Sequence, residues 1–179
     1  TLEALDNLVR SGKVRYIGAS SGPAWRMALA LSSSERHGWA RFISMQNQYN
    51  LIYREEEREM MPLLADQGVG CIPWSPLAKG RVARPWGTPT HRSTNDPRGQ
   101  RYDGDHDKPV VDAVERVAAR LGVPMAQVAM AWVLRNQLVT AAVAGPPSPL
   151  NPDTPVPAIV EMTPDVFTLR IAELPTSAI

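Results

Sequence analysis

The sequence predicts an α/β protein built on a parallel sheet. Apolar runs rich in β-branched residues lie at Val14–Ala19, Phe42–Met45, Val69–Trp74 and Val139–Ala144, and each leads into a polar or Gly/Pro-rich turn. Helical patterns lie between these runs, and strands that alternate with helices favour a parallel sheet. A closed barrel of the (β/α)8 or TIM-barrel type needs eight such units and roughly 250 residues. Since the chain has four strand runs in 179 residues, we expect the second half only of such a barrel.

The first elements follow from apolar spacing and from the residues that begin and end helices. Leucines at helical spacing predict a helix over Thr1–Ser11, which Gly12 ends. Lys13–Ser20 is predicted as a strand, because its β-branched and aromatic content fits burial on both faces. Pro23 suits the first turn of a helix that runs to about His37 and ends at a glycine.

The later elements continue the same alternation. The charged residues from Arg54 to Arg58 are expected to face solvent, at the start of a third helix. The predicted ranges are a strand at Arg41–Asn47, a helix at Glu55–Gln67, a strand at Gly68–Trp74, helices at Pro109–Leu121 and Pro124–Asn136, and a last strand at Val139–Ala144.

Two stretches depart from this alternation. Leu77–Lys108 is rich in Gly, Pro and charged residues and is too long for an ordinary connection, so we expect a functional loop. Beyond Gly145 the prolines are dense enough to forbid a helix. We therefore divide the chain into a half-barrel at 1–145 and a proline-rich divergent tail at 146–179, with a short helix expected around Val166–Leu174.

The bulk composition excludes several classes of protein. Lys and Arg total 19 and Asp and Glu total 18, so a formal net charge of +1 gives no electrostatic case for binding nucleic acid or an anionic membrane. No apolar run reaches the roughly 20 residues of a membrane-spanning helix. The single cysteine, Cys71, excludes an internal disulfide and favours a cytoplasmic location. The chain begins in a helical pattern without a methionine, so we expect it to start inside a domain.

Polar side chains follow three of the predicted strands, where a barrel places its ligand. They are Ser20 and Ser21, the run Gln46–Asn50, and the run Pro73–Gly80. Serine and glutamine can hydrogen-bond a carboxamide, and a tryptophan at a strand end offers a flat face to a planar ring. A Ser-Pro-Leu-Ala-Lys-Gly turn can direct backbone N–H groups toward a phosphate.

These motifs resemble the aldo-keto reductase family, and the likeness extends from Thr1 to about Gly145. The motifs in order are GKVRYIGAS at Gly12–Ser20, QNQYN at Gln46–Asn50, WSPLAKG at Trp74–Gly80 and PMAQVAMAWVL at Pro124–Leu134. Within the family, the sequence is most similar to the bacterial and potassium-channel β-subunit-like branch.

The resemblance implies a (β/α)8 barrel that binds NADP(H) without a Rossmann motif. It implies that Ser20 and Gln46, with Ser21 beside them, hold the nicotinamide carboxamide and that Trp74 stacks on the nicotinamide ring. The pyrophosphate would lie along the turn, with Lys79 near its charge; the residues implied there are Ser75, Pro76, Leu77, Ala78, Gly80 and Arg81.

The sequence also departs from the family pattern. Ser21 stands where the family usually has Asn, and Ser148 stands where it has a basic residue that grips the 2′-phosphate. The family's catalytic Tyr, Lys, Asp and His would all precede Thr1, so the resemblance assigns no catalytic residue to this chain. The sequence determines neither a preference for NADP over NAD nor the identity of the carbonyl substrate.

Several residues have a plainer interpretation. Without its motif, Trp74 could be a core aromatic and Gln46 could satisfy a backbone carbonyl group. Cys71 lies in an apolar run, so an inert buried thiol is favoured over a nucleophile. The three histidines are not spaced for a metal, and the acidic turn at Asp103–Asp107 lacks the closing glutamate of a calcium loop. We therefore expect no metal site.

The resemblance implies an NADP(H)-dependent oxidoreductase that reduces aldehydes or ketones to alcohols, with this chain inactive alone. One alternative is a non-catalytic regulatory subunit that senses nicotinamide cofactor, and another is a non-functional gene fragment, which the proline-rich tail favours. The expected small-molecule partner is a carbonyl substrate. Because a half-barrel leaves two sheet edges unpaired, we also expect self-association or pairing with a missing N-terminal half.

Overall fold

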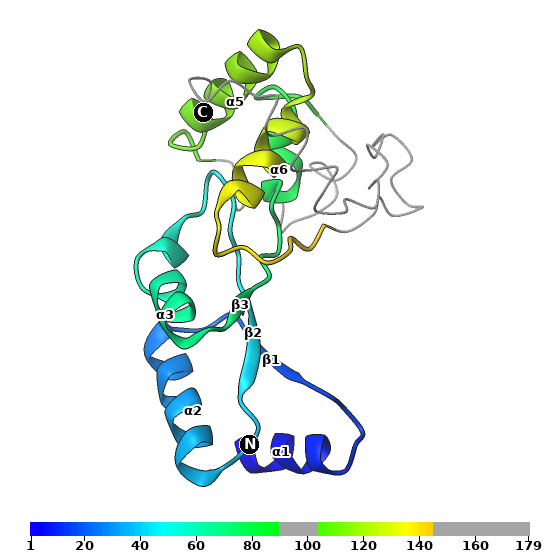
Figure 1. The fold of residues 1–179 in the computed structure, drawn as a ribbon. Coiled ribbons are helices and arrows are strands. Elements are labelled where there is room, and N and C mark those ends of the chain that lie inside the picture. Colours follow the sequence, from blue (N-terminus) through cyan, green and yellow to red (C-terminus); the bar gives the residue numbers. More distant parts are fainter. Residues whose placement is uncertain (90–103, 145–179) are drawn as a thin grey trace. The chain divides into compact units, whose positions relative to one another are not determined.

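The computed structural model describes residues 1–89 and 104–144, which belong to two compact units. The first unit comprises Thr1–Pro76 with Trp132–Val143 and contains the parallel sheet. The second unit comprises Leu77–Ala131 and the chain from Ala144 onward. Figure 1 follows the chain through both units. Most of the predicted long loop, the proline-rich tail and its expected short helix lie outside the described residues.

The elements alternate much as the sequence predicts. In chain order they are α1 (Leu2–Arg10), β1 (Ile17–Ser20), α2 (Ala24–His37), β2 (Phe42–Gln46), the 3-10 turn η1 (Glu55–Glu57), α3 (Met60–Gln67), β3 (Gly70–Cys71), the 3-10 segment η2 (Ala78–Ala83), α5 (Lys108–Leu121) and α6 (Met125–Arg135).

The predicted helix ends are confirmed where a glycine stops the helix. Gly38 ends α2 with a φ of 65°, and its N–H donates to the carbonyl oxygen of Glu35. Gly122 ends α5 with the same φ of 65°. A left-handed residue of this kind is the commonest helix stop, because glycine has no Cβ to clash.

The three strands form one parallel sheet in the order β1-β2-β3. The register pairs Ser20 with Gln46 and Met45 with Cys71. Beyond β3, the last predicted strand reaches the sheet only through isolated pairs, Cys71 with Val139 and Trp74 with Val143. The carboxyl ends of β1 and β2 therefore lie side by side.

Three predicted elements are wrong in extent. The first strand is shorter than Lys13–Ser20, and it is not buried on both faces: its residues alternate between half-buried and exposed, and Tyr16 before it is 71% exposed. The third strand is two residues long, and beyond it the backbone bonds the neighbouring segment again at Trp74, whose N–H donates to the Asn47 carbonyl oxygen. The helix predicted over Glu55–Gln67 is a 3-10 turn followed by the separate helix α3.

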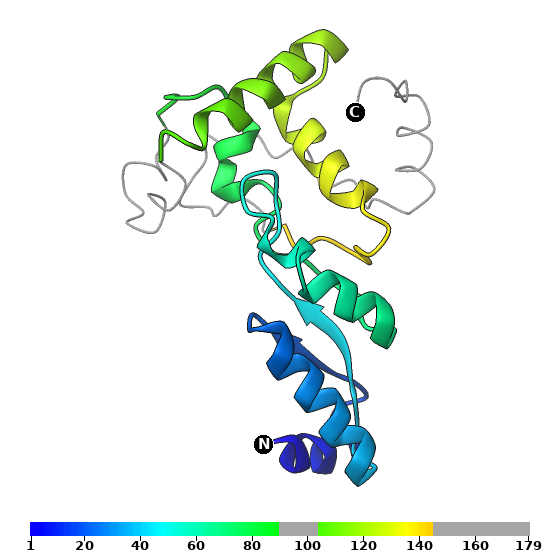
Figure 2. The same ribbon diagram turned by 90° about the vertical axis from the view of Figure 1, so that its left-hand side faces the viewer.

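The core of the first unit lies between the sheet and helices α2 and α3. Figures 1 and 2 both show α2 running alongside β1 and β2. The buried members of this core are Met27, Leu31, Met45, Tyr49, Met60, Met61, Leu64, Val69, Cys71 and Val133. Their apolar surface supplies the main stabilisation of the sheet, at about 25 cal/mol for each Å² removed from water.

The second unit has its own buried side chains. Helix α5 contacts η2, and the residues buried in this unit include Ala78, Val82, Val111, Val114, Ala118, Met125 and Ala129. Across the described part of the chain, no single helix has the length and apolar character needed to cross a membrane. Helices α5 and α6 reach that threshold only when taken together, and the chain bends by 104° between them.

Replacing Leu31 by Ala is expected to destabilise the first unit by about 2–5 kcal/mol, the usual cost of removing a buried leucine side chain. Leu31 is 1% exposed and belongs to the core. The matched control is Leu29→Ala on the same helix, where the side chain is 62% exposed. Urea unfolding followed by circular dichroism measures both, and equal losses for the two variants would contradict this placement of the core.

Candidate functional site

The first part of the candidate site lies at the carboxyl ends of β1 and β2. The Ser20 hydroxyl donates to the main-chain oxygen of Gln46 over 3.2 Å, and the Ser21 N–H donates to the same oxygen over 3.1 Å. The side chains of Ser20, Ser21 and Gln46 are all exposed. The structure therefore brings together three of the predicted cofactor contacts.

Trp74 completes this cluster. Its main-chain N–H donates to the Asn47 carbonyl oxygen over 2.7 Å, and its own carbonyl accepts from the Tyr49 N–H over 3.3 Å. The indole Nε1–H donates to the Ser21 hydroxyl over 3.2 Å. Trp74 is half-buried and is not a member of the hydrophobic core, so its interpretation as a plain core aromatic is wrong.

Ser21 has an unusual backbone conformation, with a φ of 31°. Asn tolerates positive φ better than most residues, and the family pattern has Asn at this position. Serine keeps the turn and supplies the hydroxyl that accepts from Trp74. The departure from the family pattern is therefore compatible with the local geometry.

The turn after Trp74 contains several left-handed residues. Ser75 has a φ of 58°, and Ala78, Lys79 and Gly80 have φ values of 47°, 55° and 92°. The Gly80 N–H donates to the Leu77 carbonyl oxygen over 2.8 Å, so this donor is used within the turn. Ser75 and Pro76 belong to the first unit, whereas the predicted pyrophosphate contacts from Leu77 through Arg81 belong to the second.

The second unit places Arg84, which the sequence analysis missed, near the predicted pyrophosphate contact Arg81. The Arg81 guanidinium carbon lies 5.5 Å from the centre of the Trp86 ring. The pKa of Arg84 is lowered, first by burial and then by the nearby charge of Arg81. Two adjacent cations suit an anionic ligand. The spacing of Arg81 and Arg84 in a positively charged turn was the available signal.

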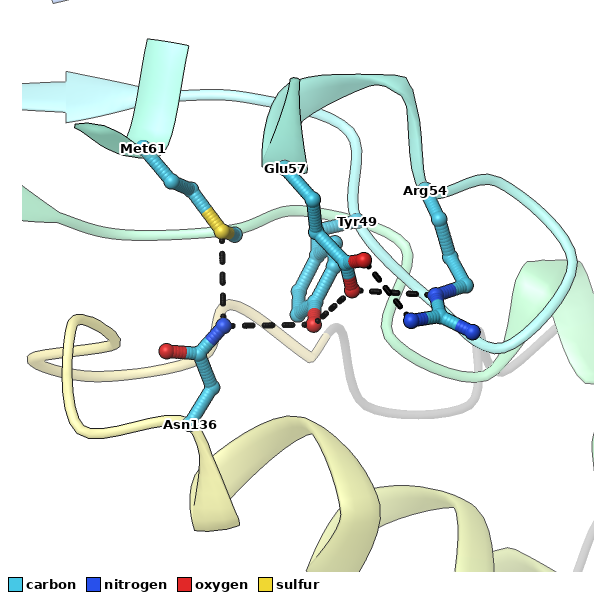
Figure 3. A network of polar contacts seen from close by, with 5 residues as sticks. All are labelled: Tyr49, Arg54, Glu57, Met61 and Asn136. Carbon is cyan, nitrogen blue, oxygen red and sulfur yellow. Dashed lines mark hydrogen bonds and ion pairs between the residues drawn. The ribbon is translucent and has the colours of Figure 1, made fainter. Parts of the chain in front are cut away.

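A network of polar contacts lies behind the strand ends (Figure 3). The Tyr49 hydroxyl donates to Glu57 Oε1 over 2.7 Å and accepts from Asn136 Nδ2 over 3.2 Å. Arg54 holds the same carboxylate through two contacts, of 3.0 and 2.7 Å. The pKa of Glu57 is lowered, first by its hydrogen bond from Arg54. Burial is the main reason that the pKa of Tyr49 is raised to about 12.

The expectation that Arg54–Arg58 is simply a solvent-facing segment is wrong. Glu56 and Glu57 are half-buried, and Glu56 accepts a hydrogen bond from Asn47. The pKa of Glu56 is raised chiefly by burial. Because η1 is a separate turn and not the first turn of α3, two of its three glutamates face the strand-end segment.

Cys71 is confirmed as a buried thiol. It is 1% exposed within the core, and burial raises its pKa to about 11. A thiol with such a pKa is protonated near neutral pH and is a poor nucleophile. Over residues 1–89 and 104–144, no cluster of three or more His, Cys, Asp or Glu side chains could hold a metal ion.

Glu57→Gln is expected to lower the free energy of unfolding by roughly 1–2 kcal/mol near neutral pH, because the charged bonds to Arg54 and Tyr49 are lost. The lowered pKa of Glu57 means that its contribution is present above the unfolded-state pKa and is lost as the pH falls through the folded-state pKa. The difference between variant and wild type should therefore shrink in acid. Urea unfolding at about pH 7 and about pH 3.5 measures it.

Glu55→Gln is the matched control for this experiment. Glu55 is in the same turn, but its side chain is 61% exposed and its ion pair with Arg58 lies at the surface. We expect little change at either pH, since exposed ion pairs contribute little. A pH-independent loss in Glu57→Gln would show that the carboxylate charge is not what the network uses.

The comparisons with known proteins agree on one family. The family model described as "Aldo/keto reductase family" matches residues 1–160. Versiconal hemiacetal acetate reductase from Aspergillus parasiticus is 48% identical over 140 residues, covering 75% of this chain and 41% of that protein. Aldo-keto reductase AMT2 from Alternaria alternata is 43% identical over 147 residues, covering 81% of this chain and 40% of that protein.

A further relative is an aldo-keto reductase from Fusarium vanettenii, which is 46% identical over 153 residues and is covered over 40% of its length. The chain thus spans about two fifths of the curated relatives that it matches. The family fold is a (β/α)8 barrel, to which the parallel strands and alternating helices of the first unit correspond. By its match over most of its length, the chain belongs to the aldo-keto reductase family.

Proposed function

We propose that this chain corresponds to the C-terminal half of an aldo-keto reductase barrel and supplies contacts to NADP(H). The observation that carries the proposal is the cluster of Ser20, Gln46 and Trp74. Parallel strands bring the first two side by side, and the indole of Trp74 is hydrogen-bonded to Ser21 next to them. In a barrel of this type, ligands bind at the carboxyl ends of the strands.

Each residue of the cluster has the chemistry that a nicotinamide needs. The exposed amide of Gln46 can both donate to and accept from a carboxamide, and Ser20 adds a hydroxyl. Trp74 is half-buried, so part of its surface remains accessible for a planar ring to stack on. Ser21 would orient the indole through its hydrogen bond, and this hydroxyl acceptor replaces the amide that the family usually has there.

The turn would lie along the pyrophosphate. Its residues in this role are Ser75, Pro76, Leu77, Ala78, Gly80 and Arg81. Arg81 and Arg84 are close enough for the charge of the first to lower the pKa of the second. A phosphate would offset the repulsion between two such cations, which supports an anionic ligand. A preference for NADP over NAD is part of the proposal, although the predicted position of a phosphate-gripping residue, Ser148, lies outside the described residues.

The whole protein would transfer a hydride between the nicotinamide and an aldehyde or ketone. The bound cofactor would supply the hydride chemistry, and the cluster of Ser20, Gln46 and Trp74 would orient its nicotinamide. The resemblance assigns the family's acid to none of this chain's motifs, so we expect the chain alone to be inactive. A cytoplasmic location remains a prediction. The likeness to the bacterial and potassium-channel β-subunit-like branch also remains a prediction, since the relatives described above are fungal.

A second candidate is a non-catalytic subunit that senses nicotinamide cofactor. The observation that supports it is the cluster of Ser20, Gln46 and Trp74 at the strand ends, which serves cofactor binding with or without catalysis. The two candidates separate on activity: when the chain is supplied with its complementary half, only the first predicts carbonyl reduction.

Saturable NADPH binding to the purified chain is expected to quench tryptophan fluorescence. Trp74→Ala should weaken that binding by about tenfold or more, since stacking of a planar ring is typically worth 1–3 kcal/mol. The matched control is Trp25→Ala on α2, where the side chain is 57% exposed and remote in sequence from the strand ends. Equal affinity for Trp74→Ala and wild type would argue against the stacking role, and NADH titrated in parallel measures the cofactor preference.

We also propose that the chain associates through its sheet edges, with a second copy or with a complementary half-barrel. Within the described sheet β1 has only β2 as a neighbour, and Tyr16, just before β1, is 71% exposed; Ile43, on the central strand β2, is 49% exposed. Unpaired edges flanked by apolar side chains promote association.

Light scattering after size exclusion is expected to show a mass that rises with protein concentration. A Tyr16→Lys, Ile43→Lys double variant should shift the chain toward monomer, because the first charge blunts the edge beside β1 and the second interrupts the exposed apolar surface of β2. Leu29→Lys serves as the control, since this exposed residue lies on α2 and not on a strand. A wild type that is monomeric at every concentration contradicts self-association.

A further inference from the structure

We propose that Tyr49 is a positioning residue for Trp74, acting through the hydroxyl that joins Glu57 and Asn136. The inference rests on the proposed cofactor site, of which Trp74 is the stacking member. It concerns how this chain holds the indole in place, and each step comes from contacts within the first unit.

The first step is the environment of the Tyr49 side chain. It is 2% exposed and is counted in the hydrophobic core. Its ring packs against Trp132 with the centroids 5.1 Å apart and the planes tilted by 33°. The Arg54 guanidinium carbon lies 5.2 Å from the centre of the same Trp132 ring. The ring is therefore enclosed, and its hydroxyl must find partners inside the protein.

The second step is what the hydroxyl joins. Glu57 comes from the turn η1, and Asn136 follows helix α6. Asn136 also approaches the Met61 sulfur at 3.3 Å and accepts from the Leu138 N–H over 3.1 Å. Figure 3 shows the Tyr49 hydroxyl lying between the Glu57 and Asn136 side chains. Two segments that are 79 residues apart in sequence, at 57 and 136, thus meet at one oxygen atom.

The third step is the main chain of Tyr49 and its neighbours. The Tyr49 N–H donates to the Trp74 carbonyl oxygen, and the Trp74 N–H donates to Asn47. Asn50 donates its side-chain amide to the Ser75 carbonyl oxygen over 3.0 Å. The backbone on both sides of the indole is therefore bonded to the segment that the Tyr49 side chain anchors.

The substitution Tyr49→Phe tests the hydroxyl separately from the packing of the ring. Phenylalanine fills nearly the same volume, so no large cavity forms, but Glu57 and Asn136 lose their common partner. Glu57 retains Arg54 and Asn136 retains Leu138. The variant should therefore fold, with the 47–50 segment less firmly held against Trp74.

The test follows Trp74 directly in the full chain labelled with 5-fluorotryptophan. The chain has five tryptophans, and loss of a fluorine signal in Trp74→Phe assigns the resonance. Tyr49→Phe is expected to shift or broaden the Trp74 signal and to weaken NADPH binding by about fivefold to tenfold, the scale of one lost buried hydrogen bond. The matched control Tyr16→Phe, at a position 71% exposed, should leave both unchanged.

A second control separates positioning from general loosening. Leu31→Ala destabilises the same core but leaves the polar partners of the Tyr49 hydroxyl in place, so below its unfolding transition it should leave the Trp74 signal in place. An unmoved Trp74 signal in Tyr49→Phe overturns the proposal, and so does an equal movement in Leu31→Ala. If the wild type binds no NADPH, the proposed function fails, while the fluorine signals still decide whether Tyr49 positions Trp74.

Discussion

The buried hydroxyl of Tyr49 is the constraint on which the strand-end region depends. A phenol in a hydrophobic core costs free energy unless its oxygen is hydrogen-bonded, and the chain meets this need with Glu57 and Asn136. Neither partner is near Tyr49 on a shared helix or strand, so satisfying one oxygen fixes the turn η1 and the segment after α6 together. Arg54 then completes the arrangement by neutralising the Glu57 carboxylate.

The sheet itself explains why the polar cluster forms where it does. Its parallel register places Ser20 beside Gln46, and the isolated pair of Gln48 with Trp74 carries the alignment past the end of β3. The core that holds this register is apolar and comes from the sheet, α2 and α3. The apolar packing therefore fixes the register of the strands. The polar side chains lie at the strand ends, beyond that core.

The sequence was sufficient for most of the helices and for their alternation with the strands, because those depend on local signals. Gly38 and Gly122 each follow a helical pattern directly and end the helix, as the sequence predicts. The strand lengths were overestimated, since exposure of Tyr16 and the pairing of only two residues in β3 depend on neighbours that a local pattern does not contain. The Tyr49 network was missed for the same reason: three glutamates in a row look like a solvent-facing turn, and Asn136 lies 87 residues from Tyr49.

The left-handed residues extend this argument from geometry to function. Ser21, Ser75, Ala78 and Lys79 all have positive φ. Such conformations cost about 1–3 kcal/mol each in strained cases, and they persist where surrounding contacts determine them. Two of the four lie beside Trp74: Ser21 bonds its indole, and Ser75 follows it and is held by Asn50. A chain that needed only to connect a strand to the next helix could do so with relaxed residues. Left-handed residues on both sides of one half-buried aromatic ring are what the proposed stacking role would require, because that role needs the ring held in a defined position.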